Sequence, residues 1–210
     1  MLPKVAHEGL AEFCDVFCEH SAFSVPESRS ILQKAQDLGL SIKLHAEQLS
    51  SHGGTRLGAE LGAASVDHLE YLSEKDADEL AESNTVAAIL PGATLFLGLT
   101  QWAPARMLLE RHIPVALSTD CNPGSSPTTN LQLMMNLGCT RMGMSVEEAL
   151  AAVTTVAARS VNREESAGSL NTGNAATLCL LKGRTTAEMV YPLGGNEVEK
   201  VMIRGKWISS

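Results

Sequence analysis

The sequence predicts an α/β fold built on a parallel sheet. Short apolar runs alternate with helical segments, and turn residues close each run, which is typical of successive βα units. The runs end at His45, His68, Pro91 and Asp120, at intervals of 23, 23 and 29 residues. That spacing suits parallel strands joined by right-handed crossovers. After residue 165 the pattern changes, because a turn-rich linker and short strands replace the alternation.

The first expected elements are a strand and a capped helix. Cys14-Asp15-Val16-Phe17 is the strand candidate, and Ser24-Val25-Pro26-Glu27 is a capping box with proline in the first turn. The helix is expected to end near Leu38, before Gly39. Further strands are expected at 41–45, 64–68, 85–90 and 114–119, and helices at 55–61, 74–82, 103–111, 128–142 and 145–160.

The C-terminal segment differs in kind. Residues 168–174 form a turn-rich linker, while 175–181 and 198–203 have the pattern of strands. Arg204-Gly205-Lys206 is a hairpin-like break before a last short strand. So few strands do not form a stable domain alone. We therefore predict two parts, residues 1–165 and residues 166–210.

Composition and charge argue against several function classes. A net charge of −8 disfavours binding to nucleic acid or an anionic membrane by bulk electrostatics. No run approaches the roughly 18 apolar residues of a membrane span. The N-terminus lacks the apolar core of a signal peptide, so the cytoplasm is the expected compartment.

The five cysteines are scattered and form no Cys-x-x-Cys pair. Neither a structural zinc ribbon nor a disulfide framework is indicated. Cys121 is expected to be a small buried residue rather than a reactive thiol.

Two other patterns also have simple interpretations. Residues 51–55 lack the lysine of a phosphate-binding loop and are expected to begin a helix, and Met134, Met135, Met142 and Met144 are expected in the core.

Three metal-compatible side chains occupy matching positions. His45, His68 and Asp120 each stand at the carboxyl end of an expected parallel strand, which is the edge that carries the chemistry in β/α barrels. Alone, each histidine is more simply structural, and Asp120 could begin an Asx-turn. Together they favour a zinc or iron(II) site, where the ion would lower the pKa of a water towards neutrality.

Several segments carry a resemblance to a known family. They are His45–Ser50, Ser65–Tyr71, Asp15–Glu19, Leu133–Asn136 and, most specifically, Ser118–Ser126 with its run Asp-Cys-Asn-Pro-Gly-Ser-Ser. In these segments the chain resembles the imidazolonepropionases, which are amidohydrolase-superfamily hydrolases of histidine degradation. The likeness covers nearly the whole chain and corresponds to the C-terminal half of such an enzyme.

The resemblance implies a partial TIM-like (β/α)8 barrel. Residues 1–165 would supply its later strands only, and residues 166–210 would supply C-terminal strands of a small β-sandwich. One metal ion, zinc or iron, would be held by His45 and Asp120. His68 would polarise the substrate carbonyl or orient the water, and Asp120 would also pass the water's proton to the leaving nitrogen.

The resemblance also implies a substrate and partners. Gln48, Asn122, Gly124 and Ser125 would contact 4-imidazolone-5-propanoate, whose ring amide would be hydrolysed to N-formimidoyl-L-glutamate. Because position 48 is Gln, a general-base role for a glutamate there is in doubt, and Glu47 is no obvious replacement because adjacent strand residues point oppositely. No nucleic acid or membrane partner is expected, and a homodimer is implied for the full-length enzyme.

One part of the family's site is missing. The family takes further metal ligands from a His-x-His pair, and no two of the six histidines here are separated by one residue. We therefore expect a partial chain that is a poor catalyst alone, with an open sheet edge that promotes association.

Two other interpretations remain. A deaminase of the same superfamily commonly has a glutamate three residues after the strand-five histidine, where this chain has Gln48. A non-catalytic scaffold would explain the missing His-x-His pair, but it would not explain why His45, His68 and Asp120 are all retained.

Overall fold

The computed structural model describes residues 1–208 of the chain. It separates into two compact units, Met1–Ile89 with Arg106–Val115, and Leu90–Ala105 with Ala116–Ser210. The division into barrel and sandwich parts after residue 165 stays a prediction.

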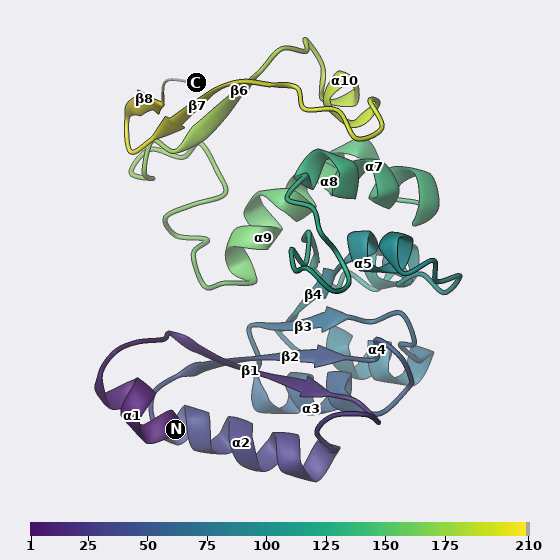
Figure 1. The fold of residues 1–210 in the computed structure, drawn as a ribbon, viewed down its shortest axis with the longest axis vertical. Coiled ribbons are helices and arrows are strands. Elements are labelled where there is room, and N and C mark those ends of the chain that lie inside the picture. The colour runs from purple at the N-terminus through teal and green to yellow at the C-terminus, as the bar shows by residue number, and fades with distance from the viewer. Residues whose placement is uncertain (209–210) are drawn as a thin grey trace. The chain divides into compact units, whose positions relative to one another are not determined.

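The first unit alternates strands and helices along the chain (Figure 1). Its strands are β1 (Phe13–Cys18), β2 (Ser41–Ala46), β3 (Ser65–His68) and β4 (Val86–Ile89), and its helices are α1 (Leu2–His7), α2 (Val25–Asp37), α3 (Gly54–Leu61), α4 (Glu74–Ala81) and α6 (Ala105–Glu110). The four strands pair in parallel and in chain order. With β5 (Val115–Leu117), the sheet order is β1-β2-β3-β4-β5. The predicted α/β fold with a parallel sheet is confirmed.

Strand β2 shows how the sheet separates apolar from polar side chains. Ile42, Leu44 and Ala46 are buried and alternate with the less buried Lys43 and His45. Successive side chains of a strand point to opposite faces. Helices α2 and α3 contact β2, and the backbone of α3 approaches the Ala46 side chain closely. The apolar face of β2 is therefore packed under helices, and Lys43 and His45 lie on the other face.

Helix α2 begins and ends where the sequence predicts. Ser24 is its N-cap and forms a capping box with Glu27, whose carboxylate accepts a hydrogen bond of 2.9 Å from the Ser24 N–H. Leu32, in the middle of the helix, is fully buried. Gly39 has a φ of +81°, a left-handed conformation that glycine adopts without strain and that turns the chain towards β2.

The second unit is mainly helical with one small sheet. Its elements are α5 (Pro91–Phe96), α7 (Leu131–Arg141), α8 (Val146–Val153), α9 (Thr155–Arg159), β6 (Leu178–Leu181), α10 (Thr186–Val190), β7 (Val198–Ile203) and β8 (Lys206–Ile208). Strands β6, β7 and β8 pair antiparallel in that order. Helix α7 packs against α5, α8 and α10. All four methionines named above are buried, which confirms that they belong to the core.

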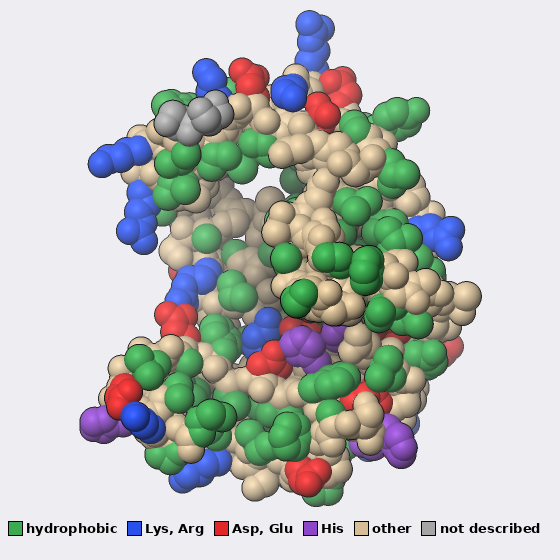
Figure 2. All heavy atoms as spheres, in the orientation of Figure 1, with side chains coloured by type: hydrophobic (Ala, Val, Ile, Leu, Met, Phe, Trp, Pro, Cys, Tyr) green, Lys and Arg blue, Asp and Glu red, His purple; other side chains and the backbone are tan. Residues whose placement is uncertain are grey.

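Some apolar side chains lie outside the two cores. Ile203, Trp207 and Ile208, on β7 and β8, are each about half exposed, and apolar side chains reach the surface around these strands in Figure 2. Across residues 1–208, every helix is too short or too polar to pass through a membrane.

Several local predictions are wrong. Residues 145–160 do not form one helix, because the chain breaks at Thr154 (φ −124°, ψ −92°), whose hydroxyl donates back to the Leu150 carbonyl at 2.6 Å. Pro91 begins α5 rather than merely closing a strand, since proline fits the first turn of a helix. Cys121 is exposed, because it lies in the polar loop after β5. The short helices α1 and α10 were not predicted.

We expect Gly58→Ala to destabilise the first unit. Alanine would favour the interior of α3 by about 1 kcal/mol. However, a Cβ at Gly58 would lie 2.4 Å from Cγ1 of Val66 on β3, and overpacking of a core costs about 1–3 kcal/mol. The clash should outweigh the propensity, so the free energy of unfolding, measured with urea, should fall by up to about 2 kcal/mol.

Val66→Ala supplies the matched background, because it removes the methyl group that meets the new Cβ. In that background the cost of Gly58→Ala should vanish or change sign. An undiminished cost there would contradict the packing explanation.

Candidate metal centre

His45 lies near the carboxyl end of β2, between β1 and β3. The strand register places it opposite Phe17 on one side and Asp67 on the other. Its Nδ1 is 2.9 Å from Oδ2 and 3.1 Å from Oδ1 of Asp15 on β1. The ring therefore has a carboxylate against Nδ1, and Nε2 is its other possible ligand nitrogen.

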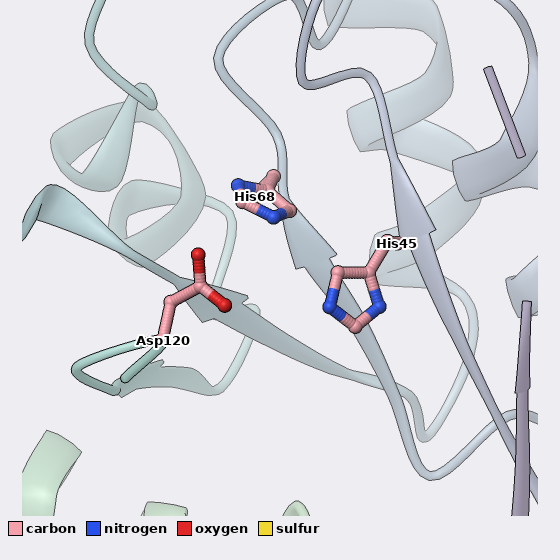
Figure 3. A group of neighbouring side chains, drawn as sticks. All are labelled: His45, His68 and Asp120. Carbon is pink, nitrogen blue, oxygen red and sulfur yellow. The ribbon is translucent and has the colours of Figure 1, made fainter. Parts of the chain in front are cut away.

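His68 is the last residue of β3 and is 2% exposed. The register pairs it with Ala46, whose side chain faces α3, so a regular pleat would direct His68 away from His45. Left-handed φ values of +86° at His68 and +73° at Leu69 break that pattern. The two imidazole rings lie with their centroids 5.3 Å apart (Figure 3). Backbone strain of this kind in non-glycine residues concentrates at functional sites.

One nitrogen of His68 has no hydrogen-bond partner. Its Nδ1 is buried and unsatisfied within residues 1–208, and Oε1 of Glu70 is 3.7 Å away, beyond hydrogen-bond distance. Buried polar atoms are rarely left in this state. Two adjacent imidazoles, one of them with an unsatisfied nitrogen, are donors that suit zinc or iron(II). The residues of the first unit therefore fit a transition-metal ion.

A second group of possible ligands shares His45. Ligand atoms of Asp15, His45 and Asp67 lie within 4.8 Å of one another. Asp67, however, already has a cation and a donor, since Lys43 Nζ is 3.4 Å from Oδ2 and the Ser65 hydroxyl donates to Oδ1 at 2.5 Å. Asp15 has His45. This group is satisfied without an ion.

Asp120 belongs to the second unit, in the loop that follows β5 (Figure 3). It has a left-handed φ of +49°. The Asn122 amide holds the turn: its Nδ2 donates to the Asp120 carbonyl and to Ser125 Oγ, and its Oδ1 accepts from the N–H groups of Gly124 and Ser125, all at 2.8 Å. These four bonds use the full capacity of the amide. The roles of Asp120, Asn122, Gly124 and Ser125 toward metal and substrate stay predictions.

Glu47 organises the loop after β2, and sequence reasoning missed this role. The residue is fully buried with a φ of +50°. Its carboxylate accepts hydrogen bonds from the N–H groups of Gly53 (2.7 Å), Gly54 (2.8 Å) and Thr55 (2.8 Å), and from the Thr55 hydroxyl. Residues 51–55 therefore lead into α3, as predicted, and the N–H groups of Gly53, Gly54 and Thr55 bind an internal carboxylate.

Glu19 holds the other side of the same loop. It is 1% exposed and accepts hydrogen bonds from the N–H groups of His20, Leu49 and Ser50 and from the Ser50 hydroxyl. Burial raises the pKa of this carboxyl, but the Ser50 hydroxyl and the three N–H donors together hold the pKa below its ordinary value. The half-buried Gln48 thus stands in a loop held by two buried carboxylates. No local signal marks either one, because all of their donors except the neighbouring His20 N–H lie five or more residues away in the sequence.

Comparison with known proteins decides the family. The sequence profile of the Amidohydrolase family matches residues 6–208. The chain belongs to the amidohydrolase family. It is 47% identical over 208 residues to a protein named imidazolonepropionase from Shewanella amazonensis, covering 99% of this chain and 50% of the relative. A protein of the same name from Geobacillus sp. is 45% identical, covering 98% of this chain and 48% of the relative. The resemblance to this group is confirmed, and the chain spans about half the length of these relatives.

Solved structures support the amidohydrolase fold. An adenosine deaminase from Xanthomonas campestris with bound zinc has a TM-score of 0.76 at 18% identity, covering 89% of this chain and 49% of that one. A variant of atrazine chlorohydrolase from Arthrobacter aurescens, complexed with zinc and atraton, has a TM-score of 0.73 at 18% identity, covering 92% and 49%. The five-stranded parallel sheet with its helices and the small antiparallel sheet are consistent with the predicted partial barrel.

We expect Glu47→Gln to destabilise this amidohydrolase chain. The amide group would turn an N–H₂ donor towards backbone donors, so buried N–H groups would lose their acceptor. Loss of hydrogen bonds to a charged group costs about 1.5–3 kcal/mol, and urea unfolding should show a loss of this size. The exposed Glu82, at the C-cap of α4, gives a matched control, because Glu82→Gln should change stability by less than about 0.5 kcal/mol. Equal effects of the two substitutions would refute the role of Glu47.

The contribution of Glu19 to stability should depend on pH. Its folded pKa lies below the unfolded value of about 4.5, so the ionised carboxylate stabilises the fold above that pH, and the stabilisation is lost as pH falls through the folded pKa. The gap in unfolding free energy between the unmodified chain and Glu19→Gln should be constant from pH 7 to about 5.5 and should shrink below about pH 4.5. Urea unfolding at each pH measures this gap. A gap that widens towards acidic pH would mean that the folded pKa of Glu19 lies above the unfolded value, not below it.

Proposed function

We propose that the protein containing this chain hydrolyses the ring amide of 4-imidazolone-5-propanoate to N-formimidoyl-L-glutamate. The observation that carries the proposal is the pair of imidazoles at the ends of β2 and β3, in a chain 45–47% identical to proteins named imidazolonepropionase. Because the chain spans about half of those relatives, the activity is proposed for the whole protein. We also propose a cytoplasmic location and a homodimer.

We propose that His45 and Asp120 bind one zinc or iron ion. His45 is the last residue but one of β2, and Asp120 follows β5; both strands belong to the five-stranded sheet. The carboxyl ends of parallel strands carry the chemistry in β/α barrels. When bound, such an ion polarises a carbonyl and makes a water more acidic. The family's His-x-His ligands are not among the six histidines of this sequence.

His68 is proposed to act on the substrate carbonyl. Its ring lies beside that of His45, so a carbonyl held near the metal ligands would be within its reach. A hydrogen bond from the imidazole to the carbonyl oxygen would stabilise the negative charge that develops there. Because His68 is buried, water competes little with that bond.

Asp120 is proposed to transfer the proton. Water adds its oxygen to the carbonyl carbon, and the carbon–nitrogen bond of the ring breaks. Asp120 accepts a proton from the water and returns it to the leaving ring nitrogen, so the carboxylate is regenerated. The turn that Asn122 holds would keep the carboxylate in place, and Gln48, Asn122, Gly124 and Ser125 are proposed to line the substrate.

Substitution of the two proposed ligands tests this function. In the protein containing this chain, His45→Ala and Asp120→Ala should each lower kcat/KM for 4-imidazolone-5-propanoate by about 10²–10³-fold or more. Each should also lower the bound metal, measured by elemental analysis. Product formation is followed by mass spectrometry.

The exposed His112 supplies a matched control. It has a left-handed φ of +58°, which asparagine tolerates, so His112→Asn should leave activity and metal content unchanged. Full activity in Asp120→Ala would refute the proposed roles of Asp120, and no turnover by the unmodified protein would favour a scaffold. Release of ammonia from purines or pyrimidines, without turnover of the imidazolone, would favour a deaminase.

A further inference from the structure

We propose that Asp15 is a positioning residue that sets the tautomer of His45 for metal binding. The inference rests on the proposed function, in which His45 is a metal ligand. Asp15 would accept the proton of Nδ1, which leaves the Nε2 lone pair directed to the ion. Histidine ligands commonly depend on such a carboxylate.

The strands determine the geometry of this pair. In the parallel register Asp15 lies opposite Lys43, and His45 is two residues further along β2, so Asp15 and His45 share the polar face of the sheet. The contact between Asp15 and Nδ1, at 2.9 and 3.1 Å, joins two hydrogen-bonded strands rather than two mobile loops. Asp15 therefore occupies a nearly constant position relative to His45.

A second contact restricts the ring. Phe17, directly opposite His45 in the register, meets the imidazole edge to face, with ring centroids 6.4 Å apart and an interplanar angle of 81°. Phe17 limits the tilt of the ring, and Asp15 determines which nitrogen carries the proton. Two contacts within the first unit thus restrict the orientation of His45.

The other nearby carboxylate is already engaged. Asp67 flanks His45 on β3, but Lys43 and the Ser65 hydroxyl bind its two oxygens. Asp67 therefore has less capacity to accept a proton from His45. Between Asp15 and Asp67, Asp15 is the one that contacts Nδ1.

Two substitutions at Asp15 separate its charge from its hydrogen bond. Asp15→Asn keeps an acceptor oxygen and removes the charge, whereas Asp15→Ala removes both. In the protein containing this chain, Zn²⁺ affinity is measured by competition with a chelator. We expect both variants to bind Zn²⁺ about 10–100-fold more weakly, with the alanine variant the weaker.

The tautomer itself is read by NMR in the metal-free protein. Two-bond ¹H–¹⁵N correlations of His45, assigned from their absence in His45→Gln, should show the proton on Nδ1 in the unmodified protein. In Asp15→Ala the proton should move largely to Nε2. A merely structural role for Asp15 would not move this signal.

Asp37 gives the control for loss of one negative charge. It lies at the end of α2, on the side where the chain enters β2, and its side chain is 70% exposed. Asp37→Asn should change neither the tautomer nor the Zn²⁺ affinity.

The outcomes distinguish the two proposals. If the unmodified protein binds no Zn²⁺ or iron, the proposed metal site fails, but the tautomer still tests Asp15. An unchanged tautomer in Asp15→Ala overturns the inference. If the alanine variant does not fold, the asparagine variant decides, because Zn²⁺ affinity equal to that of the unmodified protein would overturn it.

Discussion

The parallel pairing of β1, β2 and β3 is the constraint on which the candidate centre depends. In-register neighbours share a face, so the pairing brings Asp15, His45 and Asp67 to one side of the sheet while Ile42 and Leu44 pack under helices. A slip of one residue in β2 would exchange these faces and would bury Lys43 and His45. The apolar alternation that stabilises the sheet therefore also specifies where the imidazole stands.

His68 shows where the centre departs from regular structure. A β3 strand that kept its pleat would have turned this histidine with Ala46 towards α3. Two consecutive left-handed residues end the strand and place the ring beside His45. Such residues cost of order 1–3 kcal/mol each, and the buried surroundings of His68 and Leu69 maintain them. The sheet thus carries local strain at the edge where a reaction would take place.

Much of this fold could be predicted from the sequence, because its strand ends carry clear signals. The capping box at Ser24, the glycine after α2 and the apolar run before Asp120 placed these elements to within a few residues. The buried roles of Glu19 and Glu47 could not be predicted, since their partners follow no local period. The break at Thr154 was also missed, because a capping box marks where a helix begins and says nothing of where it bends. For the candidate site, strand-end positions predicted His45 and His68, while the backbone conformation that pairs their rings has no signature in residue type.

The buried carboxylates of Glu19 and Glu47 hold the loop after β2 mainly by accepting hydrogen bonds from peptide N–H groups. Every residue except proline carries such a group, so most side chains at Leu49 and His52 can be exchanged without disturbing the loop's path. Gln48 lies within the same stretch. The side chain at position 48, which we propose to contact substrate, can therefore be changed while Glu19 and Glu47 keep the loop in place. The loop combines a fixed backbone path with freedom of side-chain choice at its surface.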